Sequence, residues 1–365
     1  MKVTFPHMGN TCFGAKALLD GLGIDCIVPP QNSKISLEIG SQHSPEDICL
    51  PYKLMLGNYI QSIEKGADTI IITGSIGPCR FGEYCELQMN VLKKLNYNVD
   101  FIVIDYPGAI GKKEFLKRIS KLSSRSEKNS LEQLKALQNA YKVVKLMDKL
   151  ESKAHMMAGY VKNIKECKTL LERCKSQLLE CTCPESMIKL LKNYHNVMDK
   201  LEIDKTKKPL KIAIIGEIYS IIEPYCNLYI ENKLMDYGVC SQRTLTPSWW
   251  VKDAVLSPIK LNSLAIRKAS KEYLPLYIGG HARECVGEAV LACNGEYDGA
   301  IQIFPMGCMP EIVAKSILPS ISKDKDFPIM TLVVDEMTGE AGYITRIEAF
   351  LDLLERRRNN VLSRC

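Results

Sequence analysis

The chain has 365 residues, 46% hydrophobic and 25% charged, which is the composition of a globular protein long enough for two domains. Its formal net charge of +6 is small for this length and points to neither a nucleic-acid nor a membrane partner. No secretory signal and no apolar run of about 18 residues is visible, so we expect a cytoplasmic protein without membrane spans.

Residues 1–111 alternate short apolar runs with helical patterns. Apolar residues that follow one another without interruption are typical of strands in a parallel sheet covered on both faces. The sequence therefore predicts a first α/β domain, with strands at Val3–Pro6, Asp25–Pro29, Thr69–Thr73 and Val99–Asp105.

Residues 112–208 are rich in lysine, glutamate and leucine and predict two to four amphipathic helices. Apolar residues recur there at helical spacing, as in Leu131, Leu134, Leu137, Tyr141 and Val144.

Residues 209–365 return to the first pattern and end in an amphipathic helix. The segments 67–84 and 297–311 share a plan: an aspartate, an apolar strand, a turn with glycine and proline, a cysteine, then a helix. We therefore predict two doubly wound α/β domains, 1–111 and 209–365, with the helical region 112–208 inserted between them. The candidate strands of the second are Lys211–Gly216, Gly238–Cys240, Leu276–Ile278, Gly299–Phe304 and Pro328–Val334.

Fifteen cysteines are present, with no CxxC pair. In a reducing compartment such cysteines are core residues, metal ligands or catalytic groups. One group lies at strand-to-helix turns or helix starts: Cys12, Cys49, Cys79, Cys85, Cys285 and Cys308. A second group lies in the helical region and is interpreted as core packing: Cys167, Cys174, Cys181 and Cys183.

Helix starts at the carboxyl ends of parallel strands favour anions, and a thiolate is an anion. Soft thiolates suit iron–sulfur clusters, so cysteines at such ends of two domains could share one cluster. The alternative is that each cysteine of the first group is a small buried residue.

Two histidines accompany these cysteines. His7 follows the first strand near Cys12, and His281 lies near Cys285. Each could donate to a cluster sulfide or supply a proton, or be a hydrogen-bonded turn residue. The loop "TGSIGP" lacks the spacing of a phosphate loop, and no GxGxxG occurs.

Seven short motifs, in order, make the chain resemble the 2-hydroxyacyl-CoA dehydratase superfamily. Within it, the chain is similar to the stand-alone acyl-CoA dehydratase activase-related (CoA protein activase) proteins and to the double-cubane cluster proteins. The motifs are "FPHMGN", "EDICLPYK", "GPCRFGEY", "GEIYSIIEPYCN", "GGHARECVGEA", "FPMGCMPE" and "VDEMTGEAGYITRIEAFLD".

The resemblance implies two flavodoxin-like domains with a helical region and an oxygen-sensitive cluster in the cleft between the domains. Cys49, Cys79 and Cys308 match the three cysteines that hold a [4Fe–4S] cluster in dehydratase subunits. In the double-cubane proteins six cysteines hold an [8Fe–9S] cluster. Cys12, Cys85 and Cys285 are the further cysteines that could complete such a site.

The resemblance also implies a partner, an ATP-hydrolysing iron–sulfur activator that injects low-potential electrons. Because this chain lacks phosphate loops, it looks like the electron acceptor, which would reduce or dehydrate a small substrate with His7, His281 or Glu311 as proton donor. A homologous α/β subunit or a second copy of the chain is a further possible partner. Two alternatives stay open: a non-catalytic electron-relay or scaffold subunit, and a metal-free nucleotide- or phosphate-binding protein.

Overall fold

The structure, a computed structural model, describes residues 1–74, 79–104, 110–259 and 261–362, with backbone alone at 112, 115, 259, 361 and 362. Most of "TGSIGP" and the predicted strand end at Asp105 thus lie outside the described residues. The chain forms two compact units. Unit 1 comprises Met1–Leu150, Leu170–Asp199 and Thr246–Asn262, and unit 2 comprises Glu151–Thr169, Lys200–Leu245 and Ser263–Cys365.

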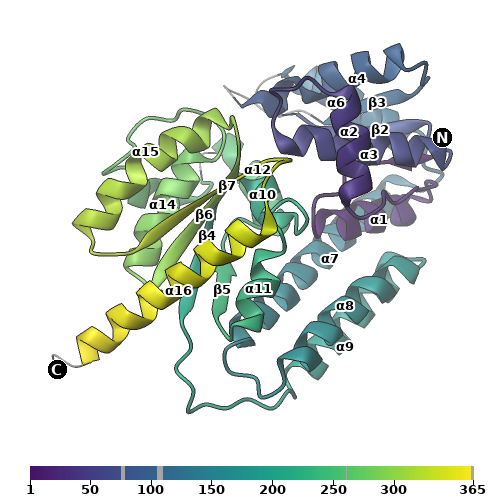
Figure 1. The fold of residues 1–365 in the computed structure, drawn as a ribbon. Helices are drawn as coiled ribbons and strands as arrows, with labels where there is room; N and C mark the ends of the chain where they lie inside the picture. The colour runs from purple at the N-terminus through teal and green to yellow at the C-terminus, as the bar shows by residue number, and fades with distance from the viewer. Residues whose placement is uncertain (75–78, 105–109, 260, 363–365) are drawn as a thin grey trace. The chain divides into compact units, whose positions relative to one another are not determined.

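Unit 1 contains a parallel sheet with the strand order β1-β2-β3 (Figure 1). The strands are β1 (Val3–Thr4), β2 (Thr69–Thr73) and β3 (Asp100–Ile104). The strand predicted over Asp25–Pro29 is reduced to one bridge between Val3 and Cys26. The adjacent Pro29 and Pro30 have no N–H to continue a ladder.

Helices surround this sheet, and one of them, α3, is buried along most of its length. A Cβ atom on Gly57 of α3 would lie 1.9 Å from the Ser36 carbonyl oxygen of α2, so the two helices cross in backbone contact. The helices that lie wholly in unit 1 are α1 (Thr11–Leu22), α2 (Lys34–His43), α3 (Leu50–Glu64), η1 (Arg80–Glu83), α4 (Tyr84–Lys94), α6 (Lys112–Ser123), α9 (Pro184–Met198), α12 (Pro247–Leu256) and η2 (Ser257–Ile259).

Unit 2 contains a second parallel sheet, with the strand order β5-β4-β6-β7. Its strands are β4 (Lys211–Gly216), β5 (Cys240–Arg243), β6 (Gly299–Pro305) and β7 (Ile329–Val334). The strand predicted over Leu276–Ile278 is wrong. That segment is a loop in which Leu276 is 72% and Tyr277 60% exposed, between Pro275, which lacks an N–H, and two glycines with positive φ.

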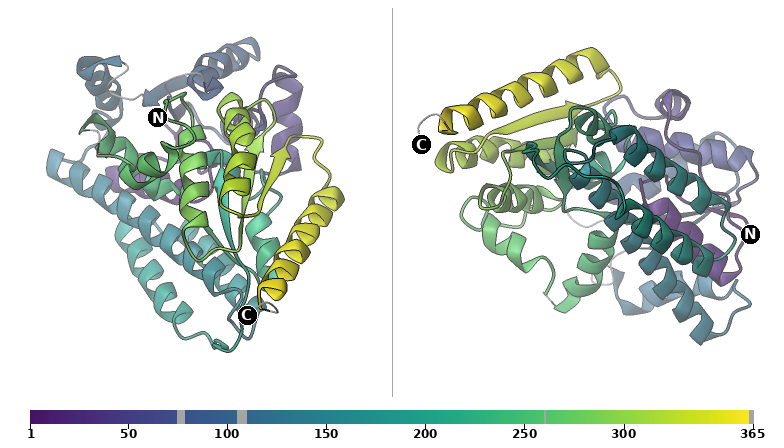
Figure 2. Two further views of the ribbon diagram at one scale, coloured as in Figure 1. Left: turned by 90° about the vertical axis from the view of Figure 1, so that its left-hand side faces the viewer. Right: turned by 90° about the horizontal axis from the view of Figure 1, so that it is seen from below.

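Helices cover both faces of this sheet, with α14 and α15 on one side and α16 on the other (Figures 1 and 2). Ala282, Cys285 and Ala289 of α14 pack with strand residues in one buried cluster. On the other side, Phe350 and Leu354 of α16 lie over Gly299. The helices of unit 2 are α10 (Ile218–Ile222), α11 (Ile230–Asp236), α13 (Leu264–Ser270), α14 (Ala282–Cys293), α15 (Met309–Asp324) and α16 (Glu340–Leu362).

The described part of the helical region forms four helices, in agreement with the prediction. They are α6, α7 (Ser130–Met157), α8 (Ile164–Glu180) and α9. Residues of α7 and α8 are divided between the two units. The predicted fold class, two parallel-sheet α/β domains with inserted helices, is confirmed, whereas the boundaries at 111/112 and 208/209 stay a prediction. No helix in the described ranges is long and apolar enough to cross a membrane.

Candidate functional site

Cys49, Cys79 and Cys308 occupy equivalent places in the fold. Each is the residue directly before a helix: Cys49 before α3, Cys79 before η1 and Cys308 before α15. Their φ angles are −67°, −71° and −73°, and all three have extended backbones. None of the three thiols accepts a capping hydrogen bond from its own helix. The helix-start position that the sequence indicates is therefore what the structure shows.

The local sequence explains two of these positions. Cys49-Leu50-Pro51 and Cys308-Met309-Pro310 share the pattern Cys-x-Pro, and each proline lies in the first turn of its helix. Proline is well suited there, because the N–H that it lacks would have no partner within the helix. Before Cys308, Gly307 adopts a φ of +76°, which turns the chain from β6 into α15.

In unit 1, Cys49 is a buried residue, only 8% exposed. It forms a short hydrogen bond with the hydroxyl of Tyr84, the first residue of α4. The Tyr84 ring packs against Tyr52 and Phe81, each at a centroid distance of 5.1 Å. The Tyr84 hydroxyl is thus a polar neighbour of the sulfur, and it belongs to a ring held in place by aromatic packing.

The other three candidate cysteines lie inside helices rather than before them. Cys12 and Cys85 are the second residues of α1 and α4, and Cys12 is buried whereas Cys85 is half-buried. Cys285 is the fourth residue of α14 and fully buried. Burial raises the pKa of the Cys285 thiol well above its ordinary value, and the neighbouring Glu311 carboxyl adds to the effect. The surroundings of Cys285 therefore favour the neutral thiol.

Glu311 and Cys285, predicted for different roles, contact each other in unit 2. Glu311 lies in the first turn of α15 and accepts a hydrogen bond from the Gln302 amide of β6 at 2.9 Å and another from the Cys285 thiol. Burial raises the Glu311 pKa to about 7, and the two hydrogen bonds oppose this. Glu311 can therefore hold or release a proton near neutral pH.

A second buried carboxyl lies on the same helix as Cys285. Burial raises the pKa of Glu288 well above its ordinary value, the Thr244 hydroxyl opposes the shift, and the charges of Glu284 and Glu311 add to it. Glu284, Glu288 and Glu311 therefore lie close enough for their charges to act on one another, and burial favours the neutral form of Glu288.

The two histidines lie at turns. His7 is 9% exposed, and its backbone N–H donates to Asn58 of α3 while its carbonyl accepts from Asn32. His281 directly precedes α14. The preceding Gly280 packs on Pro310, since a Cβ atom there would lie 2.6 Å from the Pro310 Cγ. This contact joins the turn of His281 to the first turn after Cys308.

The structure gathers some predicted site residues and not others. Glu311 meets Cys285, and the His281 turn meets the start of α15. Cys49 and Cys79 belong to unit 1 and Cys308 to unit 2. Across the ranges that the structure describes, no three His, Cys, Asp or Glu side chains lie together as a group that could hold a metal ion.

Comparison with known families gives a match over residues 8–243, more than half of the chain. The matching family is described as the CoA enzyme activase uncharacterised domain. The chain belongs to this family. A comparison with curated proteins finds no match.

The match to the CoA enzyme activase family includes Cys49 and Cys79 but ends before Cys285 and Cys308. It therefore supports the predicted kinship to activases and dehydratases in general. The parallel between Cys308 and Cys49 depends instead on their shared backbone conformation and their shared Cys-x-Pro pattern.

Sequence reasoning missed Tyr84, Gln302 and Glu288. Gln302 is an isolated polar residue inside the apolar strand β6, which is a visible signal that it serves a buried partner. Tyr84 and Glu288 give no comparable signal, because nothing in their local sequence indicates which distant side chain they contact.

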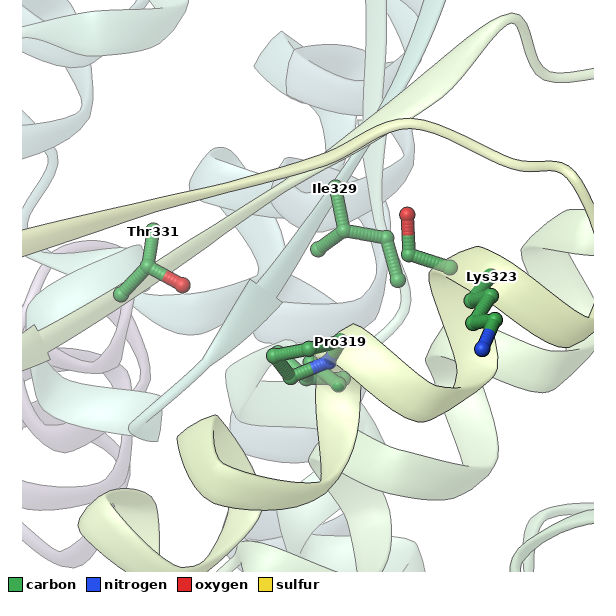
Figure 3. A pocket seen from close by; sticks show the side chains of 6 residues that line it. Pro319, Lys323, Ile329 and Thr331 are labelled. Atoms are coloured by element: carbon green, nitrogen blue, oxygen red, sulfur yellow. The ribbon is translucent and has the colours of Figure 1, made fainter.

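A pocket of about 300 Å³ lies between α15 and β7 (Figure 3). Pro319, which lines it, is some 16 Å along α15 from Cys308 at about 1.5 Å per residue. The hydroxyl of Thr331, another lining residue, donates to the side-chain amide oxygen Oε1 of Gln302 at 3.0 Å. The residues that line the pocket include no cysteine, histidine or carboxylate. They are Leu318, Pro319, Ser322, Lys323, Ile329 and Thr331.

Proposed function

We propose that the chain is an iron–sulfur protein whose cluster is bound by Cys49, Cys79 and Cys308. The observation that carries the proposal is the equivalent position of these three thiols, each before a helix, with similar φ and without a capping role. At such a position the helix dipole and the backbone N–H groups of the first turn stabilise a thiolate. Thiolates are the ligands that iron–sulfur clusters need.

A bound cluster would supply one-electron chemistry at low potential. We propose that the electrons come from a separate ATP-hydrolysing partner and that a small substrate is reduced or dehydrated. Membership of the CoA enzyme activase family supports this assignment in general terms. The absence of phosphate loops from the sequence supports the role of acceptor rather than ATPase.

Three residues are candidates for moving a proton in this reaction. Glu311 has a pKa of about 7 and lies one helical turn beyond Cys308, so it can exchange a proton near neutral pH. His7 and His281 lie at turns that contact the helices beginning after Cys49 and Cys308. We propose Glu311 as the proton donor, with the histidines as the alternatives.

The test is to reconstitute the protein anaerobically with iron and sulfide and compare the single variants Cys49→Ser, Cys79→Ser and Cys308→Ser with wild type. Serine is itself a good residue before a helix, so these variants keep the helix starts. We expect each to lose at least half of the bound iron, measured with sulfide per chain.

Cys183→Ser is the matched control. Cys183 also directly precedes a helix, α9, and is followed by Pro184, but it is not among the proposed ligands. The control should retain its iron. Wild-type iron content in all three ligand variants, or no iron in the wild type after reconstitution, would show that the proposal is wrong.

A further inference from the structure

The hydroxyl of Tyr84 has a specific polar role at Cys49. It lies within hydrogen-bond distance of the Cys49 sulfur, and both side chains are buried. A phenol O–H is a stronger donor than a thiol, and a metal-bound thiolate can only accept. When Cys49 is a thiolate ligand, the hydrogen bond therefore runs from Tyr84 to the sulfur.

Tyr84 also joins two of the proposed ligand segments. It follows η1, the short helix that begins directly after Cys79. From the same helix, the Arg80 guanidinium donates to the Asp47 carbonyl oxygen at 2.7 Å, two residues before Cys49. Two polar contacts thus hold the segment of Cys79 against the segment of Cys49.

We propose that Tyr84 is a positioning residue that fixes the Cys49 sulfur and raises the reduction potential of the cluster bound there. This inference rests on the proposed function. Reduction adds negative charge to a cluster, and a hydrogen bond to a ligand sulfur stabilises that charge. Removal of the hydroxyl alone should make the reduced state harder to reach.

The neighbouring Tyr52 provides a matched control. Its ring packs edge-on against that of Tyr84, so both belong to the same aromatic cluster. The Tyr52 hydroxyl is buried, and no described residue accepts or donates a hydrogen bond to it. Tyr52→Phe and Tyr84→Phe therefore remove the same atom from the same cluster, but only the second removes a hydrogen bond to Cys49.

The first experiment is a redox titration of the reconstituted protein in which EPR spectra report the fraction of reduced cluster. We expect Tyr84→Phe to shift the midpoint potential to a more negative value with iron content near that of wild type, and Tyr52→Phe to leave the potential unchanged. If wild type holds a cluster and both variants have the wild-type midpoint potential, the inference is overturned while the proposed function stands.

The second experiment uses iron-free protein and separates the two hypotheses. In a double-mutant cycle of Cys49→Ala and Tyr84→Phe, measured by urea unfolding, we expect the two substitutions to couple by about fivefold in the unfolding equilibrium constant. For Cys49→Ala and Tyr52→Phe, the effects of the two substitutions on the unfolding equilibrium constant should be independent, so that their product matches the double variant to within about twofold. An uncoupled Tyr84 pair overturns the inference even if iron binds. A coupled pair in a chain that binds no iron overturns both the proposed function and the effect on potential.

Discussion

At the scale of single residues, Glu311 shows how burial and hydrogen bonding act in opposite directions on one carboxyl group. Burial raises its pKa, the hydrogen bonds from Gln302 and Cys285 lower it, and the charges of Glu217 and Glu284 raise it again. The result is a pKa of about 7 against an ordinary value of 4.5. The Glu311 carboxyl is therefore a group whose charge depends on pH in the neutral range.

This shift predicts a pH dependence of stability. Between about pH 4.5 and 7, Glu311 is protonated in the folded chain and ionised in the unfolded chain. The folded state then binds more protons, so the free energy of unfolding falls as the pH rises through this window, by up to about 3 kcal/mol in total. Urea unfolding of iron-free protein at several pH values measures the slope.

Glu311→Gln is the control for this prediction. The amide has no titrating proton, so the variant should lose the part of the slope that Glu311 itself contributes, while Glu288 still titrates in both proteins. Equal slopes in wild type and variant would contradict the pKa assigned to Glu311.

At the scale of elements, the crossing of α2 and α3 positions the helix that begins after Cys49. Cβ atoms on Gly40 and Gly57 would lie 1.7 Å from the Lys53 carbonyl oxygen and 1.9 Å from the Ser36 carbonyl oxygen. Both obstacles are backbone atoms, which cannot move aside as a flexible side chain does. The helices can cross at this distance only because both positions are glycine.

We therefore expect Gly57→Ala to lower the free energy of unfolding by about 3 kcal/mol, because the helices must separate. Gly342→Ala is the control. Gly342 lies within α16, has ordinary helical backbone, and a Cβ atom there would meet no atom within 4 Å. That substitution should stabilise the protein by about 0.5–1 kcal/mol. Equal effects of the two alanines in urea unfolding would contradict the packing argument.

Elements with uninterrupted apolar runs were predictable from sequence. The strands Thr69–Thr73 and Lys211–Gly216 match the structure residue for residue, because buried parallel strands are apolar on both faces. The helix predicted over 131–144 is also present, but the leucines that indicated it do not lie on its buried face. Leu131 is 80%, Leu134 52% and Leu137 56% exposed.

The reason is a close helix contact that a hydrophobic pattern does not reveal. A Cβ atom on Gly14 of α1 would lie 2.1 Å from Val144, and one on Gly21 would lie 2.8 Å from Ala136, both on α7. Where two helices approach so closely, small side chains fit and leucines do not. The face of α7 that packs on α1 is therefore marked by alanine and valine.

In the candidate site, too, some features follow from the local sequence and others do not. The helix-start position of Cys49 and Cys308 follows from local Cys-x-Pro sequence. The contact of Cys49 with Tyr84 joins residues 35 positions apart and depends on how α3 and α4 pack. Contacts of that kind are set by tertiary structure and leave no local pattern to read.

At the scale of the whole molecule, a buried ionic network binds the end of α7 to unit 2. Arg243 of β5 pairs with Glu151 of α7 and with Glu231 of α11, and Glu231 also contacts His155 at 2.9 Å. All four side chains are buried. Removal of one partner would leave a buried charge uncompensated, so the network holds residues 151–157 to unit 2.

The distribution of cysteines over the molecule predicts how much iron it holds. A cluster bound by Cys49, Cys79 and Cys308 alone corresponds to about four iron atoms per chain. A second cubane would need Cys285 as a thiolate, but burial and Glu311 raise its pKa, and Glu288 is close enough to repel the same charge. We therefore expect about four irons in wild type and the same number in Cys285→Ser, whereas Cys308→Ser, compared with them, should lose iron.

About eight irons in wild type, falling in Cys285→Ser, would contradict this expectation. Cys285 would then have to shed its proton against the carboxyl groups that now surround it, so Glu311 and Glu288 would have to remain protonated or move. Iron content measured in the single variants Glu311→Gln and Glu288→Gln would separate these cases. If wild type instead holds about four irons, a neutral amide at either position favours the Cys285 thiolate, so a gain of iron in either variant would show that these carboxyl groups limit the chain to one cluster.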